Sequence, residues 1–256
     1  CGLHWRARRR RALVNDAPAR RFRARAVLID LDGTLLDTID DLAAAANAML
    51  VELGVGARPV ADVRRFVGKG AESLVQRALT GSLDAPIDAS RLAQALPVFR
   101  RHYARENGVS ARCYPGVVAG LTAMRAMGLE LACVTNKPIA FTLPLLERTG
   151  LARWFDIVIG GDSLPRKKPD PAQLLHVCDG FGIAASEAVM IGDSMNDALA
   201  ARAAGMPVFV LPYGYNEGRD VAELDADAVI ESLEHAATLI EPLTPAIRAA
   251  DSPAHR

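Results

Sequence analysis

The stretch AVLIDLDGTLLD, residues 26–37, decides the fold of this chain. Its first four residues, Ala26–Ile29, are apolar and mostly branched, which predicts a buried parallel strand. Asp30 and Asp32 follow at the carboxyl edge of that strand, where open α/β sheets bind their ligands. Alternation along an extended chain points both carboxylates the same way, and Gly33 lets the backbone approach a ligand closely. Because two like charges so close need a cation between them, the stretch indicates a metal-assisted site with a candidate carboxylate nucleophile.

The same residues also have a purely structural interpretation. Asp, Gly and Thr after a strand are ordinary turn and helix-capping residues. Complementary groups at the ends of other strands would favour the functional interpretation, so the rest of the chain decides between the two.

The composition excludes some classes of protein. Half of the 256 residues are hydrophobic, yet no apolar run is long enough to span a membrane, so we expect no membrane partner. Few aromatic residues and abundant alanine favour helices packed on a sheet over an all-β fold.

The formal charge of zero hides an uneven distribution of charge along the chain. Residues 1–25 hold nine Arg and one Asp (+8), which leaves 21 basic and 29 acidic residues (−8) in the remainder.

The Arg-rich start of the chain, which includes Arg8–Arg11, admits several interpretations. It would suit a nucleic-acid arm or a transit peptide, but it lacks the apolar segment typical of secretion. We expect residues 1–24 to form a basic, disordered leader, and we do not expect nucleic acid as a partner.

The four cysteines, Cys1, Cys113, Cys133 and Cys178, are widely spaced and form no CxxC pair. Cys133 lies in an apolar run and is expected to be a buried thiol. This usage favours a reducing, cytoplasmic setting. The sequence leaves the oligomeric state open between a monomer and a homodimer.

A helical insertion follows the first strand. Thr38–Leu53 is predicted to be a helix, with Thr38 as its cap and Gly54 at its end. Glycine and proline separate further segments with apolar residues at helical spacing: Val63–Val67, Ala71–Leu79 and Ala89–Asn107. We therefore expect a helical cap domain over residues 38–112. Because this cap begins directly after the paired aspartates, it should lie over them as a lid.

From Tyr114 onward, strand-like and helix-like segments alternate. Strands are expected at Leu129–Val134, Ile157–Ile159, Ala188–Ile191 and Val208–Leu211, with a short edge strand at Ala228–Ile230. Helices are expected to begin near Val117, Pro138, Pro171 and Met195, and a last helix to cover Leu233–Ile240. Repeated strand, helix, strand units predict an α/β fold with a Rossmann-like parallel sheet. Residues 25–37 and 113–241 would form this core, and residues 242–256 a flexible tail.

Polar side chains follow a second predicted strand and occupy one later loop. Val134 is followed by Thr135 and Asn136, whose donors can hold the oxygens of a tetrahedral anion. Lys168, held by the adjacent Pro169, can neutralise charge on a phosphoryl group. Taken singly, these are an ordinary turn and an ordinary exposed lysine.

A third strand repeats the design of the first. Gly192 leads directly into Asp193, and Asp197 follows. Carboxylates from two neighbouring strands can supply the oxygen ligands that Mg²⁺ prefers, although Asp197 is also a candidate helix cap. Complementary groups at four separate places make chance agreement improbable, which favours a functional site.

The sequence resembles the haloacid dehalogenase superfamily of aspartyl-phosphate phosphohydrolases across residues 25–235. All four motif positions of that superfamily are present in order, namely Asp30–Thr34, Thr135, Lys168 before Pro169, and Gly192–Ser194 with Asp197. Within the superfamily the chain is most similar to the bacterial phosphoglycolate phosphatases, through Val67–Ala71, Thr135–Pro138 and Tyr213–Asn216. These narrower matches are less specific than the catalytic ones.

The resemblance implies a phosphatase that acts on a small phosphorylated metabolite, with 2-phosphoglycolate as the expected substrate. Asp30 would attack phosphorus, and Asp32 would act as acid and then as base. Mg²⁺ would be held by the Asp30 carboxylate, the Asp32 backbone carbonyl and Asp193. Asp197 would lie in the layer behind these ligands.

The resemblance also assigns the remaining groups. Thr135, Asn136 and backbone amides near Gly33 would bind phosphoryl oxygens, while Lys168 would stabilise the charge that develops. In the cap, Lys69 and Arg77 are candidates for binding the carboxylate of a small acid, and each could equally be a surface cation.

Other functions remain open at this point. A sugar phosphate or pyrophosphate could replace phosphoglycolate as the substrate, and a mutase would require a sugar bisphosphate. Dehalogenation is disfavoured because Asp32 supplies the proton donor that ester cleavage needs. A catalytically silent binding protein on the same fold is disfavoured because Asp30, Lys168 and Asp193 are also present.

Overall fold

The centre of the fold is a six-stranded sheet whose neighbouring strands all run parallel. It is described by a computed structural model that covers residues 21–243. In spatial order the strands are β6 (Ile157–Ile159), β5 (Glu130–Val134), β2 (Ala26–Ile29), β7 (Ala188–Gly192), β8 (Val208–Val210) and β9 (Ala228–Val229). The chain builds β5 and β6 on one side of β2 and then β7 to β9 on the other side. Asp30 therefore follows the strand at which the order reverses, which is where α/β sheets bind ligands.

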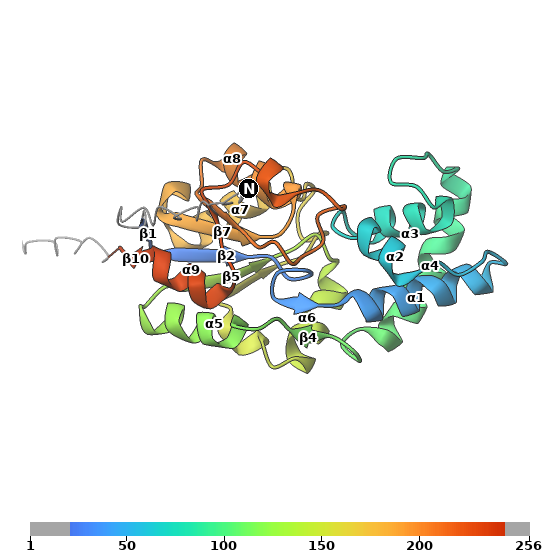
Figure 1. Cartoon of the computed structure of the whole chain (residues 1–256), viewed down its shortest axis with the longest axis horizontal. Coiled ribbons are helices and arrows are strands. Elements are labelled where there is room, and N and C mark those ends of the chain that lie inside the picture. The colour runs from blue at the N-terminus through green and yellow to red at the C-terminus, as the bar shows by residue number, and fades with distance from the viewer. Residues whose placement is uncertain (1–20, 244–256) are drawn as a thin grey trace, which may run out of the picture.

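Helices cover both faces of this sheet (Figure 1). α5 (Val117–Ala126), α6 (Ile139–Arg148) and α9 (Leu233–Leu239) pack on one face, and α7 (Ala172–Phe181) and α8 (Met195–Ala204) pack on the other. Side chains alternate along β2, so Val27 and Ile29 join the first layer and Leu28 joins the second. Short 3₁₀ turns lie at Ala152–Trp154, Ala185–Glu187 and Val221–Glu223. This layered arrangement confirms the predicted α/β fold class.

The helical insertion has a hydrophobic cluster of its own. It consists of α1 (Ile39–Glu52), α2 (Val60–Phe66), α3 (Ala71–Thr80) and α4 (Ala89–Glu106), which we call the helical module. Its cluster includes Met49, Val75 and Phe99, and Figure 1 shows the module beyond one end of the sheet. The four helices overlap the predicted helical segments, although α2 begins three residues before the predicted Val63, while domain boundaries at 38 and 112 stay a prediction. In residues 21–243, no helix combines the length and the apolar character needed to cross a bilayer.

Two short strands join the sheet to the module. β3 (Leu36–Asp37) and β4 (Arg112–Cys113) pair antiparallel where the chain enters and leaves the module. Two residues are too few for a periodic pattern, so neither strand is predicted from the sequence. The carboxylate of Asp41 on α1 strengthens this junction, because it accepts hydrogen bonds from the backbone N–H groups of Gly108 (2.8 Å) and Ser110 (2.7 Å).

The predicted limits of the leader and the tail are wrong where the structure describes them. Phe22–Ala24 forms β1, which pairs in parallel with β10 (Ile240–Pro242). Phe22 is buried against the ring of Phe209, at 4.9 Å between ring centroids, while Arg23 faces outward. Because this part of the sequence is rich in arginine, its alternation of buried and exposed side chains was not recognised as a strand. The rest of the predicted leader and tail, residues 1–20 and 244–256, lies outside the described residues.

Replacing Gly120 on α5 with alanine is expected to lower the free energy of unfolding by about 1–3 kcal/mol, because cores resist overpacking. An added Cβ would lie 2.4 Å from the backbone carbonyl carbon of Leu233 on α9, which cannot turn aside as a side-chain tip can. Urea unfolding followed by circular dichroism measures the change. Gly56→Ala is the matched control, since a Cβ there meets no atom within 4 Å. A Gly120→Ala variant as stable as this control would contradict the close packing of α5 on α9.

Candidate active site

Asp30 and Lys168 form the centre of the site. Lys168 Nζ lies 3.0 Å from Asp30 Oδ1 as an ion pair, without the alignment of a hydrogen bond. Lys168 is buried and donates hydrogen bonds to the Val134 carbonyl (2.7 Å) and to Asp197 Oδ1 (2.6 Å). Burial raises the pKa of Asp30 to about 6; the Lys168 ammonium opposes this rise and the Asp197 carboxylate adds to it. The structure thus brings together the predicted nucleophile and the predicted lysine.

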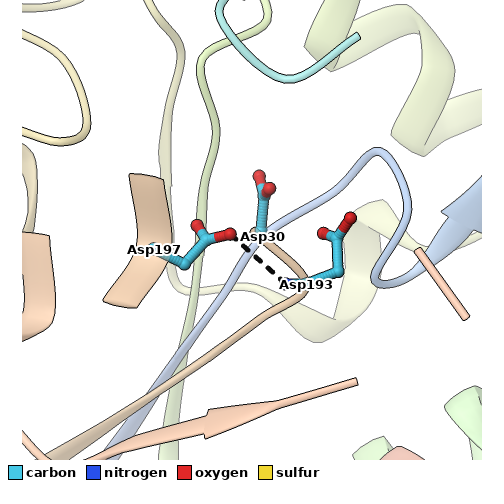
Figure 2. Close-up of side chains that lie close together, drawn as sticks. All are labelled: Asp30, Asp193 and Asp197. Carbon is cyan, nitrogen blue, oxygen red and sulfur yellow. Dashed lines mark hydrogen bonds between the residues drawn. The ribbon is translucent and has the colours of Figure 1, made fainter. Parts of the chain in front are cut away.

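Asp193 and Asp197 approach Asp30 from the segment that follows β7 (Figure 2). One oxygen from each of these three carboxylates lies within 4.8 Å of the other two. Thr34 Oγ1 donates to Asp193 Oδ1 at 2.7 Å, and the backbone N–H of Tyr215 donates to Oδ2. The backbone N–H of Asp193 donates to Asp197 Oδ2 at 3.3 Å, which Figure 2 marks with a dashed line. The carboxylates are therefore held in place by partners of their own.

This cluster carries more negative than positive charge. Within the described chain, three aspartates share one ammonium, and burial together with Asp197 and Asp30 raises the pKa of Asp193 well above its usual range. Asp30 Oδ1 is buried without a hydrogen-bond partner, so it keeps a lone pair for a cation. Asp197 differs, because Lys168 occupies its Oδ1 and Ser194 Oγ donates to its Oδ2 at 2.7 Å. The residues present could hold a metal ion, with Asp30 and Asp193 as the inner carboxylates.

Two glycines leave room for the Asp193 side chain. A Cβ at Gly33 would lie 2.4 Å from Asp193 Oδ2, and a Cβ at Gly214 would lie 2.2 Å from the same atom. Gly33 also has a φ of +86°, which side-chain-bearing residues rarely adopt. Its backbone N–H donates to the Leu36 carbonyl at 2.9 Å. Gly33 therefore shapes the site, and its own amide is not free for the phosphoryl contact predicted there.

Asp32 contacts a second buried lysine, Lys137, to which the sequence analysis assigned no role. Lys137 Nζ donates to both carboxylate oxygens of Asp32 at 2.9 Å. Thr38 Oγ1 donates to Asp32 Oδ1 at 2.6 Å and makes no capping bond to α1, contrary to the prediction. Burial lowers the pKa of Lys137, but Asp32 and Tyr103 outweigh this effect and raise it, so the ammonium stays charged. The signal in the sequence was the position of Lys137 directly after Asn136 at the end of a strand.

A cavity of about 50 Å³ lies beside Asp30 and Asp32, and residues of the helical module line its other walls. Leu42, Leu74 and Phe99 give those walls an apolar character. The predicted lid position of the insertion agrees with this arrangement. A ligand held by the aspartates would meet apolar side chains on its far side.

Thr135 and Asn136 line the cavity as predicted, but they differ in the donors they have to offer. Thr135 Oγ1 accepts a hydrogen bond from the backbone N–H of Lys137 (3.2 Å), which leaves the hydroxyl hydrogen able to donate to a ligand. Asn136 Nδ2 donates to the carbonyls of Gly68 (3.1 Å) and Lys168 (2.9 Å). Asn136 thus ties the sheet to the module, and the prediction that its amide binds a phosphoryl oxygen is wrong in this arrangement.

The site and the fold match those of known hydrolases. The model of the haloacid dehalogenase-like hydrolase family matches residues 24–205. The chain belongs to this family. It is 57% identical over 217 residues to a phosphoglycolate phosphatase of Nitrosospira multiformis. The aligned region covers 85% of this chain and 96% of that protein. A phosphoglycolate phosphatase of Thiobacillus denitrificans is 51% identical over 84% of this chain and 95% of its own length.

A solved structure shows the same fold in this hydrolase family. The crystal structure of a predicted phosphoglycolate phosphatase from Haemophilus somnus superposes with a TM-score of 0.79. The two chains are 32% identical, and the match covers 84% of this chain and 97% of the other. The two chains therefore share one fold over most of their lengths.

The two cations predicted to bind substrate do not line the cavity of this hydrolase. Arg77 is buried, and its guanidinium donates to Glu217 Oε1 (2.7 Å) and to the Phe66 carbonyl (3.1 Å). Lys69 keeps 45% of its side chain exposed, pairs with Glu217 at 3.2 Å, and lines a separate cleft beside Lys168. The prediction of substrate binding is wrong for Arg77, because its donors hold Glu217 and the module backbone. Lys69 is likewise committed to Glu217 in this arrangement.

Arg77→Met is expected to lower the free energy of unfolding by about 2 kcal/mol, because it leaves Glu217 and two backbone carbonyls without their buried donor. Lys69→Met should change it by less than about 1 kcal/mol, since the Lys69 side chain is 45% exposed and Glu217 keeps its partner Arg77. Urea unfolding measures both effects. Equal stabilities of the two variants would contradict the structural role of Arg77.

Proposed function

We propose that this hydrolase is a Mg²⁺-dependent phosphomonoesterase that acts through an aspartyl-phosphate intermediate, with 2-phosphoglycolate as its substrate. The observation that carries the proposal is Asp30 Oδ1, which accepts no hydrogen bond in the described chain and lies 3.0 Å from the Lys168 ammonium, on a residue of the aspartate cluster that also lines the cavity beside Asp32. A carboxylate oxygen that is buried, unbonded and close to an ammonium suits an attacking nucleophile.

In the first step, Asp30 attacks phosphorus and the bond between phosphorus and the ester oxygen breaks. Asp32 donates a proton to that oxygen, which leaves as the alcohol. In the second step, Asp32 takes a proton from a water molecule whose oxygen attacks the phosphorus of the aspartyl-phosphate. The bond to Asp30 breaks, inorganic phosphate leaves, and both aspartates return to their starting states.

The cationic and hydroxyl groups of the site support both steps. Lys168, at 3.0 Å from Asp30 Oδ1, offsets the negative charge gathered around the phosphoryl group. The Thr135 hydroxyl can donate to a phosphoryl oxygen from the cavity wall. Mg²⁺ would be held by Asp30, Asp193 and the Asp32 backbone carbonyl, with Asp197 behind them. When bound, it screens the phosphoryl charge from the attacking carboxylate.

The small cavity supports a small substrate. The cavity of about 50 Å³ between the aspartates and the apolar module walls is small, which favours a short organic group on the phosphate. The relatives from Nitrosospira and Thiobacillus bear the name phosphoglycolate phosphatase. The intact set of Asp30, Asp32, Lys168 and Asp193 argues against a silent binding protein. A cytoplasmic location and a monomeric or homodimeric state stay predictions.

Asp30→Asn is expected to reduce kcat for 2-phosphoglycolate by at least about a thousandfold while the protein stays folded, because the amide is a poor nucleophile. Phosphate release in Mg²⁺ and circular dichroism measure activity and folding. Asp40→Asn, an exposed position in the first turn of α1, is the control and should retain activity. Unchanged turnover in Asp30→Asn would remove Asp30 as the nucleophile.

Removing divalent cations with a chelator is expected to abolish phosphate release, and added Mg²⁺ should restore it.

Gly214→Ala should weaken Mg²⁺ binding by about tenfold or more, because the added Cβ would displace Asp193. Titration calorimetry of metal-free protein with Mg²⁺ gives the affinity, with Gly56→Ala as the control. Full activity in excess chelator would refute the metal dependence.

A further inference from the structure

We propose that Lys137 and Tyr103 together recognise a carboxylate on the substrate, and so determine which phosphate esters this hydrolase prefers. This inference rests on the proposed phosphatase function and adds to it the residues that select the substrate. It replaces Lys69 and Arg77, which the structure places outside the cavity.

Lys137 is the cation that faces the cavity. Of the residues that line the cavity in the described chain, it alone carries a positive charge. Its side chain is 4% exposed, and its ammonium lies 2.9 Å from both oxygens of Asp32 and 4.8 Å from the centre of the Tyr103 ring. An ammonium among apolar walls attracts an anion more strongly than one in water does. A ligand with a second negative group would find its partner here.

Tyr103 supplies an independent observation that points to a ligand. Its side chain is buried and lines the same cavity, and its hydroxyl makes no hydrogen bond of normal geometry within the described chain, although it lies close enough to the Lys137 ammonium to help raise the pKa of that lysine. Its ring packs between Phe99, at 5.5 Å, and Phe141, at 4.9 Å between centroids, so the hydroxyl is held in position. Buried hydroxyl groups almost always have a hydrogen-bond partner. A carboxylate beside Lys137 would provide that partner.

The first turn of α3 supports the same site. Gly70 and Ala71 line the cavity, and Gly70 caps this ten-residue helix without any side-chain hydrogen bond to its N–H groups. Free N–H groups at a helix start favour a nearby negative charge. The module thus contributes a tyrosine and a helix start to the walls of the cavity that Lys137 also lines.

The spacing of these groups fits the proposed substrate. In 2-phosphoglycolate a single methylene separates the ester oxygen from the carboxylate. Asp32, which would protonate the ester oxygen, is in direct contact with Lys137, which would bind the carboxylate. Neighbouring groups on the protein therefore match neighbouring groups on the ligand.

The test compares 2-phosphoglycolate with ethyl phosphate, in which a methyl group replaces the carboxylate. We expect the ratio of their kcat/KM values to fall about thirtyfold in Lys137→Met and about tenfold in Tyr103→Phe, as for lost hydrogen bonds to a charged group. In Tyr103→Phe the change should appear in KM for 2-phosphoglycolate. Using the ratio removes any effect of Lys137 on Asp32 that both esters share.

Two matched variants serve as controls. Tyr114→Phe removes another buried hydroxyl that lacks a partner in the described chain, but Tyr114 does not line the cavity. Lys69→Met removes a cation of the module that lies outside the cavity. Both should keep the wild-type ratio. A fall in the ratio for Lys69→Met, with Lys137→Met unaffected, would return the role to Lys69.

The outcomes separate the inference from the function. A wild-type ratio in both Lys137→Met and Tyr103→Phe would overturn the inference and leave the phosphatase function intact. Absence of phosphate release from either ester by the wild-type protein in Mg²⁺ would refute the function itself. If Lys137→Met is inactive, calorimetry in the Asp30→Asn background replaces turnover. There Lys137→Met should weaken binding of 2-phosphoglycolate about tenfold more than binding of ethyl phosphate, and equal effects would overturn the inference.

Discussion

The buried ammonium of Lys168 is the interaction on which the rest of the site depends. It donates to the carbonyl of Val134 at the end of β5, pairs with Asp30 after β2, and pairs with Asp197 at the start of α8. One charge thus joins the ends of β5 and β2 to the start of α8, the helix that follows β7. A buried charge is costly unless it is paired, so the geometry of these ends is tightly constrained.

The aspartate cluster around this lysine has an excess of negative charge that the protein itself does not neutralise. Hydrogen bonds from Thr34 and Tyr215 hold Asp193 in place, and glycines at 33 and 214 make the space that its carboxylate needs. The chain therefore commits several residues to a carboxylate that repels its neighbours. Such an arrangement is favourable when a divalent cation completes it.

The helical module is attached to the sheet through polar contacts at the site. Glu217, in the loop after β8, pairs with Arg77 and Lys69 of the module, and its φ of 59° is uncommon for a residue with a side chain. The same loop carries Tyr215, whose hydroxyl donates to Asp37 Oδ1 at 2.6 Å and accepts from the backbone N–H of Thr38 at 2.7 Å. The sheet edge and the helical module are thus joined through a few fixed contacts. Lys137 occupies the boundary between them.

The sequence by itself determined the sheet, the helices and the aspartates, because these depend on local periodicity and on groups that follow a strand end directly. It misassigned β1 and β10, because their pairing joins segments more than two hundred residues apart. Only the tertiary structure decided which groups the cationic side chains contact. Arg77 became buried against Glu217, 140 residues away, and Lys137 reached Asp32 across 105 residues. A charged side chain looks the same in the sequence whether it faces solvent, a backbone carbonyl or a ligand, and only the folded arrangement supplies its partner.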